Sequence, residues 1–197
     1  YAHRKGLIGL TACLKGEVPV CLVERRFNDA LKAADEFLQI LGKDNLYLCS
    51  ILAINPDNGQ LKWYYQFSPH DEFDYDSTQV PVLGELTIDG RARKVMMWAN
   101  RNGFYYVFDR VTGQFLSGTP FVKQNWAVGL DEMGRPVKAP GRGPSAAGTV
   151  TFPGVQGGTN WFAPSYSPVT KLFYLNTWDD YSSIFFAWDQ DYEQIGR

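Results

Sequence analysis

Hydrophobic and polar positions follow one another in short runs that predict β-strands for most of the chain. LYLCSILAIN (46–55) is an apolar run with β-branched residues, and QLKWYYQF (60–67) alternates as a half-buried strand does. KVMMWAN (94–100) and GFYYVFD (103–109) predict a hairpin that turns at Arg101-Asn102-Gly103, because Asn-Gly favours tight hairpin turns.

The remaining segments complete this pattern and reveal a change near residue 43. SYSPVTKLFYLNTW (165–178) predicts another strand pair, and IFFAWD (184–189) predicts a last strand. Residues 131–158 are rich in Gly and Pro and predict a long loop. In contrast, NDALKAADEFLQIL (28–41) has apolar residues at helical spacing and predicts a helix between an Asn N-cap and Gly42. The expected domains are therefore 1–43, with that helix, and 44–197, which is built of strands.

Composition supports an all-β chain and excludes several classes of protein. Aromatic residues make up 15% of the 197 residues, with 19 Gly and 11 Pro, which favours strands joined by turns. A net charge of −2 argues against nucleic-acid binding, which requires a basic surface. No run of 18 apolar residues and no recognisable signal peptide occur, and three scattered Cys fit neither a disulfide framework nor a zinc site.

A weak internal repeat suggests the arrangement of the strands. AINPDNGQLKW (53–63) and YVFDRVTGQFL (106–116) share a strand, an Asn or Asp, three residues, a Gly and a second strand. Gly59 and Gly113 are 54 residues apart. A period near fifty suits blades of a β-propeller, although two ordinary hairpins would also explain it.

Five blocks of the sequence together resemble the quinoprotein alcohol dehydrogenases, the enzymes that use pyrroloquinoline quinone (PQQ) and include methanol and ethanol dehydrogenases. The blocks occur in that family's order and spacing, between Asp44 and about Tyr181. They are AINPDNGQLKW (53–63), PHDEFDYDSTQVPVL (69–83), RKVMMWANRNGFYYVFDRVTGQFL (93–116), NWAVGLDEMGRP (125–136) and PGVQGGTNWFAPSYSP (153–168).

The resemblance implies a fold that this chain is too short to complete. The family fold is an eight-bladed β-propeller of more than twice this length, so residues 44–197 are expected to form about three blades of four-stranded antiparallel sheet. Residues 1–43 do not resemble the family. A fragment is the expectation, with a frame error, a fusion or an extra domain as explanations of the N-terminal segment.

An acidic cluster, HDEFDYD (70–76), is the first candidate site. In an extended segment residues two apart point the same way, so Asp74 and Asp76 are expected to face one cation while Tyr75 turns away. Hard cations take oxygen ligands. An acidic surface loop is the alternative that the residues alone leave open.

The resemblance gives these carboxylates roles. Asp74 matches the family's catalytic base, which takes the hydroxyl proton of the alcohol while hydride passes to PQQ, and both Asp74 and Asp76 are expected to bind metal. Asp76 is similar to the additional acidic ligand of the lanthanide-dependent members, which favours a lanthanide ion over Ca²⁺. A solvated Asp at the rim is the alternative for Asp76.

Three further residues match positions at the cofactor. Arg101 matches the arginine that donates hydrogen bonds to the quinone oxygens, and Asn160, in GGTNW, matches an asparagine near PQQ. Trp161 borders the cofactor or packs the blade, and core packing is the stronger expectation from its residue type. An exposed turn arginine is the alternative for Arg101, while turn formation accounts for Asn100 and Asn102.

The implied function is the oxidation of a primary alcohol to an aldehyde, with electrons passing to a cytochrome c-type acceptor in the periplasm. The family's Glu and Asn metal ligands, its adjacent-cysteine ring and the tryptophan under PQQ lie upstream of the matching region. This chain alone is therefore expected to have little or no activity. A non-catalytic PQQ-like propeller scaffold and an inactive truncated product are the alternatives.

Overall fold

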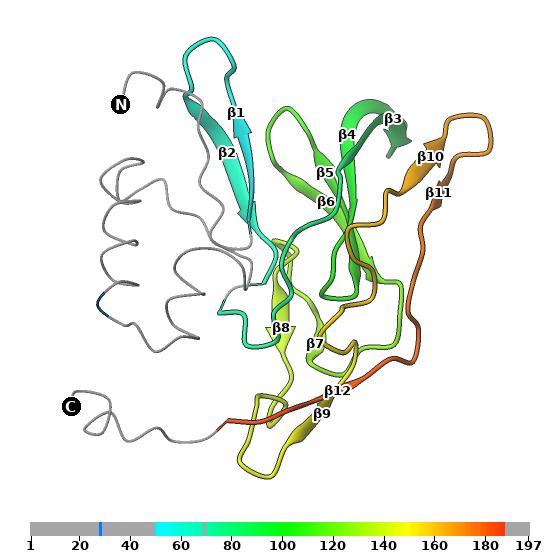
Figure 1. The fold of residues 1–197 in the computed structure, drawn as a ribbon. Coiled ribbons are helices and arrows are strands. Elements are labelled where there is room, and N and C mark those ends of the chain that lie inside the picture. Colours follow the sequence, from blue (N-terminus) through cyan, green and yellow to red (C-terminus); the bar gives the residue numbers. More distant parts are fainter. Residues whose placement is uncertain (1–27, 29–49, 69, 188–197) are drawn as a thin grey trace. The chain divides into compact units, whose positions relative to one another are not determined.

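The computed structural model describes Asn28, residues 50–68 and residues 70–187 (Figure 1). The predicted helix at 28–41 lies outside these residues except for Asn28, as does the rest of the 1–43 segment. The described chain forms twelve strands in antiparallel sheets, which confirms the all-β prediction. It divides between Gln66 and Phe67 into two compact units.

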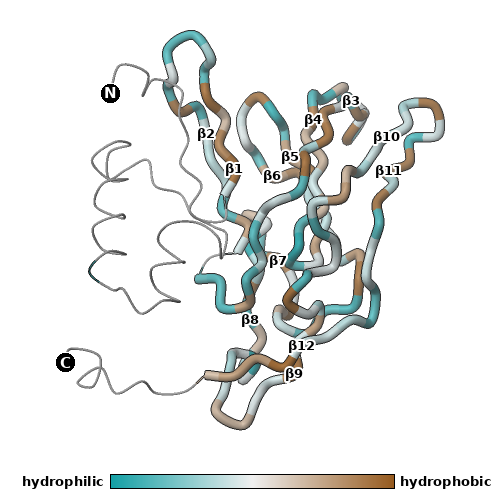
Figure 2. Tube along the Cα trace, viewed as in Figure 1, coloured by the Kyte–Doolittle hydropathy of each residue, from teal (hydrophilic) through white to brown (hydrophobic). Residues whose placement is uncertain are grey.

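The first unit contains one hairpin, β1 (Ser50–Ile54) and β2 (Leu61–Gln66). The hydrophilic turn between them is teal in Figure 2. The Asn55 side chain accepts the Asp57 N–H at 3.1 Å, and the Asn55 carbonyl accepts the Gly59 N–H at 2.8 Å. Gly59 has a φ of 72°, which a residue with a side chain rarely adopts, so NPDNG makes the turn that its sequence predicts.

The second unit is built around a four-stranded sheet in which consecutive strands are neighbours (Figure 1). Its strands are β3 (Val82–Ile88), β4 (Arg91–Ala99), β5 (Phe104–Asp109) and β6 (Phe115–Pro120). The predicted hairpin is β4–β5, with Ala99 opposite Tyr105 at its closed end. This meander has the strand count and the order expected for one complete propeller blade.

The inner strands of the sheet are covered on both faces from Val95 to Ala99 of β4 and from Phe104 to Phe108 of β5, which explains why these two stretches are continuously apolar. On one face Val95, Met97 and Val107 form a core that Tyr166 and Phe173 cover. On the other face the rings of Phe67 and Trp98 lie 5.0 Å apart, and more aromatic rings continue the layer. These rings are Tyr106, Phe108, Phe104, Trp126, Tyr75 and Phe73.

The remaining strands pair as two-stranded sheets. They are β7 (Ala127–Leu130) with β8 (Pro136–Lys138), β9 (Thr149–Thr151) with β12 (Ser183–Phe185), and β10 (Ser165–Ser167) with β11 (Leu172–Tyr174). The β10–β11 hairpin confirms the predicted strand pair. The prediction of a loop over 131–158 was wrong in part, because β8 and β9 lie inside it. In the described part of the chain no helix is long and apolar enough to cross a membrane.

Candidate active site

The turn between β4 and β5 presents Arg101 from a rigid support. The Asn100 N–H donates to the Phe104 carbonyl at 2.9 Å, and Gly103 closes the turn with a φ of 90°. The side-chain oxygens of Asn100 and Asn102 accept the N–H groups of residues 102 and 104, each at 3.0 Å. Turn formation therefore accounts for both asparagines, as predicted.

The same two asparagines also tie the turn to its surroundings, which sequence reasoning missed. The Asn102 amide donates to the Phe67 carbonyl at 3.2 Å and to the Tyr106 hydroxyl at 2.9 Å. The Asn100 amide donates to Ser77 Oγ at 2.9 Å. The turn that carries Arg101 is thus fastened to both ends of the acidic segment.

The acidic segment folds around the side chain of Asp71. Its Oδ1 accepts the Phe73 N–H at 2.9 Å and its Oδ2 accepts the Tyr75 N–H at 2.6 Å. Asp74, between these two residues, has a φ of 64°. The segment is therefore a bent loop and not the extended one that was expected, because Asp71 supplies local hydrogen bonds in place of a strand partner.

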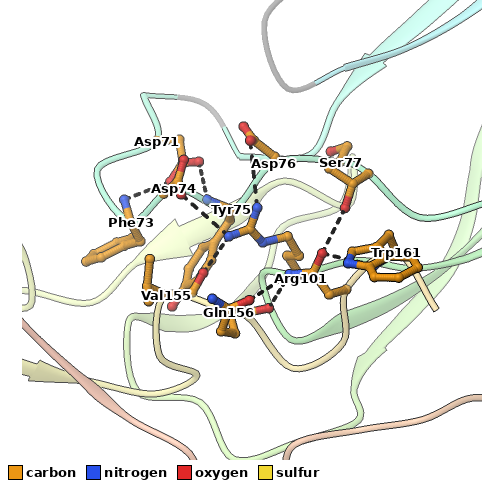
Figure 3. Close-up of polar contacts among 12 residues, drawn as sticks. Asp71, Phe73, Asp74, Tyr75, Asp76, Ser77, Arg101, Val155, Gln156 and Trp161 are labelled. Carbon is orange, nitrogen blue, oxygen red and sulfur yellow. Dashed lines mark hydrogen bonds and ion pairs between the residues drawn. The ribbon is translucent and has the colours of Figure 1, made fainter. Parts of the chain in front are cut away.

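Asp74 and Asp76 nevertheless approach the same cation, the guanidinium of Arg101 (Figure 3). Asp74 Oδ2 lies 3.6 Å from Arg101 Nη2, and Asp76 Oδ2 lies 3.7 Å from Nη1. Tyr75 turns away as predicted, is fully buried and donates from its hydroxyl to the Pro153 carbonyl at 2.5 Å. The structure thus brings together three of the predicted site residues.

Burial distinguishes these residues from a solvated acidic surface. Arg101 is only 7% exposed and Asp76 only 6%, so the alternatives of an exposed turn arginine and a solvated rim carboxylate are both wrong. The Asp74 side chain is 37% exposed, against 9% for that of Asp76. A small molecule can therefore reach Asp74 more readily than Asp76.

A glycine pair packs against the backbone of Arg101. Gly158 donates its N–H to the Arg101 carbonyl at 2.9 Å, and Arg101 Nη2 donates to the Val155 carbonyl at 2.5 Å. Gly157 has a φ of 79°, and a Cβ there would lie 2.6 Å from the Arg101 carbonyl oxygen. The two glycines of GGTNW thus allow this close approach. Arg101 Nε is buried and has no hydrogen-bond partner among the described residues.

The chain then leads directly to Asn160 and Trp161. The Asn160 amide donates to the Gln156 carbonyl at 3.0 Å, and its Oδ1 accepts the Trp161 N–H at 2.9 Å. Trp161 is 71% exposed and stacks on Phe162 with ring centroids 5.5 Å apart, so the expectation that it packs in the core was wrong. The indole of Trp161 therefore lies at the surface of the described part of the chain.

Burial also shifts the pKa values of two groups beside Arg101. Desolvation raises the pKa of Asp71, and its bonds from the Phe73 and Tyr75 N–H groups oppose that rise only in part. Desolvation likewise raises the pKa of Tyr75 far above its ordinary value of 10.0. Tyr75 therefore stays a neutral hydroxyl that donates to Pro153.

The donor set fits one side of a hard-cation and quinone site. Two carboxylates approach different nitrogens of one guanidinium, which also carries an unused donor, and carboxylate oxygens are the ligands that Ca²⁺ takes. No group of three or more His, Cys, Asp or Glu side chains that could hold a metal occurs in the described residues. Ca²⁺ takes six to eight oxygens, so Asp74 and Asp76 supply only part of such a shell.

Comparison with known proteins defines the family to which this chain belongs. Residues 38–124 match the sequence model of the PQQ family, described as the β-propeller domain of glucose, ethanol and alcohol dehydrogenases. Matches to alcohol dehydrogenases of this type extend over about 68% of the chain. The chain therefore carries part of the β-propeller of the quinoprotein alcohol dehydrogenase family, as its sequence blocks indicated.

Individual relatives make the likeness concrete. The chain is 45% identical over 134 residues to 1-butanol dehydrogenase (cytochrome c) of Thauera butanivorans and 48% identical over 135 residues to quinohemoprotein alcohol dehydrogenase ADH IIB of Pseudomonas putida. These matches cover 68% of this chain and 19% and 20% of the two relatives. A solved europium-containing methanol dehydrogenase aligns with a TM-score of 0.64 and 39% identity, over 69% of this chain and 24% of that one. The chain thus spans about a fifth of the length of its curated relatives.

Proposed function

We propose that this chain is part of a PQQ-dependent enzyme that oxidises a primary alcohol to an aldehyde. The observation that carries the proposal is the convergence of Asp74 and Asp76 on the buried Arg101, in a chain with the family's sequence. A scaffold propeller needs the turns and the packed aromatic rings, but it needs no such group of charges. The chain spans about a fifth of the curated relatives, so turnover requires the remaining blades, and we expect little or no activity from this chain alone.

The exposures of the two carboxylates support different roles for them. Asp74, the more exposed, acts as the base that accepts the hydroxyl proton of the alcohol while the adjacent C–H bond breaks and the carbonyl of the aldehyde forms. Asp76, nearly buried, would supply a carboxylate oxygen to the metal ion, and Asp74 would supply another. When bound, PQQ supplies the acceptor of the hydride and the metal ion supplies a Lewis acid.

Arg101, Asn160 and Trp161 are the residues that we assign to the cofactor. The guanidinium of Arg101, whose Nε–H has no hydrogen-bond partner among the described residues, would donate to a quinone oxygen, and its positive charge would stabilise the negative charge that develops there. The Asn160 side chain accepts the backbone N–H of Trp161 and so holds that residue in place. The exposed indole of Trp161 offers a face on which the flat ring of the cofactor would lie.

The second carboxylate favours a lanthanide ion over Ca²⁺. A trivalent ion is better balanced by two carboxylates than by one, and one structure similar to this chain belongs to a europium-containing methanol dehydrogenase. The name of the Thauera relative supports a cytochrome c as the electron acceptor. A cytochrome partner of this kind and PQQ itself both point to the periplasm as the place of action.

Thermal unfolding of the full chain tests the site, because a ligand that binds only the folded state raises the midpoint. We expect PQQ with La³⁺ to raise the midpoint more than PQQ with Ca²⁺, and Asp76→Asn to abolish that difference. Glu132→Gln, which removes an exposed carboxylate elsewhere, is the control and is expected to behave as the wild type. No shift with either ion would reject the binding of PQQ and metal by this chain, and an equal loss in the control would reject the role of Asp76.

A further inference from the structure

We infer that Asp71 is a positioning residue that aims the carboxylates of Asp74 and Asp76 by fixing the backbone between them. The role of the two carboxylates in binding metal rests on the proposed function. The hydrogen bonds of Asp71 that fix the backbone do not depend on it. One carboxylate receives the N–H of Phe73 at 2.9 Å and that of Tyr75 at 2.6 Å, which are the residues on either side of Asp74.

The conformation of Asp74 shows why such a constraint is needed. Its φ of 64° lies in the left-handed region, which residues other than Gly seldom occupy without local hydrogen bonds. With the backbone turned in this way, the next two side chains diverge. Tyr75 goes into the interior, where it reaches the Pro153 carbonyl, and Asp76 returns to the side of Arg101 on which Asp74 lies.

Other contacts hold the side chains of this loop, including those of Phe73 and Tyr75, but they do not bond the backbone N–H groups on either side of Asp74. Glu72 forms an ion pair with Lys138 of β8, which also lies 5.9 Å above the Phe73 ring. The Glu72 side chain is 30% exposed, so this pair ties the outside of the loop to the β7–β8 hairpin. Only Asp71, among the side chains with recorded contacts in the described chain, bonds the N–H groups on both sides of Asp74.

The burial of Asp71 is consistent with this assignment. Desolvation raises the pKa of Asp71, which means that its charged form is less favourable here than at the surface. A fully exposed aspartate would not have this cost in free energy. Figure 3 shows its two bonds to the backbone beside the Asp74 and Asp76 contacts with Arg101. Mutation of a partner that orients a metal ligand typically lowers the metal affinity by about 10–100-fold.

The first test reads the backbone of the metal-free full chain by NMR. A positive φ brings the amide proton and the α-proton of a residue close together, so Asp74 should give a strong cross-peak between them. We expect that cross-peak to weaken in Asp71→Asn, which keeps one acceptor oxygen, and to fall in Asp71→Ala, which keeps none, to the intensity of residues with an ordinary negative φ. The indole N–H signal of Trp126, bonded to the Asn102 carbonyl at 2.8 Å, reports that the fold is intact.

The outcomes decide the inference without any ligand. An unchanged Asp74 cross-peak in a folded Asp71→Ala variant would overturn it. If that variant loses the Trp126 signal, the milder Asp71→Asn variant decides by the same criterion. Glu72→Gln removes the same charge from the neighbouring residue and should leave the Asp74 cross-peak as it is, so an equal change in this variant would also count against a specific role of Asp71.

The second test uses La³⁺ alone as the probe and follows the amide shifts of Asp74 and Asp76. We expect Asp71→Asn to weaken the La³⁺ affinity at these residues by about 10-fold or more, and Glu72→Gln to weaken it far less. Equal weakening in both variants would assign the effect to charge and contradict the inference. If the wild type shows no La³⁺ response at all, the proposed metal site fails, while the metal-free test still decides the role of Asp71.

Discussion

The substitution Gly157→Ala tests how closely the cofactor-side segment must approach Arg101. Gly157 has a φ of 79°, so an Ala there costs about 1–2 kcal/mol in backbone conformation. Its Cβ would lie 2.6 Å from the Arg101 carbonyl oxygen and 2.7 Å from Arg101 Cα, and these backbone atoms cannot rotate away. Overpacking of this kind costs about 1–3 kcal/mol more, which gives a total loss of about 2–5 kcal/mol.

Gly141→Ala is the matched control, because Gly141 has a φ of 68° but nothing within 4 Å of its ideal Cβ. It should lose only the backbone part, about 1–2 kcal/mol. The contact with Arg101 thus accounts for a difference of about 1–3 kcal/mol, or roughly 2–12 °C between the midpoints of the two variants. The assay is thermal unfolding of both variants, supported by urea unfolding at one temperature.

The comparison has a clear contrary result. If Gly157→Ala loses no more stability than Gly141→Ala, the close packing of the glycine pair on Arg101 is not a constraint on this sequence. The same two variants allow a second measurement, the stabilisation by ligand. Because the displaced segment also carries the carbonyl that Arg101 Nη2 contacts, Gly157→Ala should reduce the stabilisation by PQQ with La³⁺, whereas Gly141→Ala should keep it.

Three further predictions concern the surroundings of the site. Trp126→Phe leaves the buried Asn102 carbonyl without the indole donor at 2.8 Å, and it should lower the free energy of unfolding in urea by about 1–3 kcal/mol. An unchanged free energy of unfolding would contradict the importance of that bond. Asn102→Asp replaces the amide that donates to Phe67 and Tyr106 by a buried charge, and it should lower the free energy of unfolding by about 3–5 kcal/mol at neutral pH. Acid should restore part of this stability, which unfolding followed by absorbance or circular dichroism can measure. Burial raises the pKa of Tyr105 to about 12, so the folded state keeps a proton that the unfolded state loses, and stability should fall as pH rises from 10.0 to about 12. Tyr105→Phe should reduce that slope and leave the part that Tyr75 contributes, because burial raises the pKa of Tyr75 as well, and an unchanged slope would contradict the role of Tyr105.

The elements of the fold were largely predictable because their signals are local. The Asn-Gly turn and the apolar runs on both sides of it gave the β4–β5 hairpin, and the alternation in QLKWYYQF gave β2. The strands β8 and β9 were missed because each has only three residues and lies among Gly and Pro. Their pairing depends on partners that periodicity cannot show.

The candidate site was predictable as a set of residues, but its geometry was not. The resemblance identified Asp74, Asp76 and Arg101, and the structure brings them together. Nothing in the pattern revealed that Asp71 bends the segment, because an Asp two residues before a turn is a common feature of any loop. Trp161 was expected in the core on residue type alone, and the local bend at Asn160 overrides that preference.

The sequence distances across the site have a kinetic consequence. The strands β3 to β6 are joined by short turns, so each hairpin of this sheet can close within microseconds. The bond from Arg101 to Val155 spans 54 residues and that from Tyr75 to Pro153 spans 78, so both must wait for long segments to meet. The contacts of Arg101 with Val155 and of Tyr75 with Pro153 are thus the late-forming part of this unit. A chain cut before Pro153 would lack both contacts, together with Tyr166 and Phe173, which cover one face of the blade.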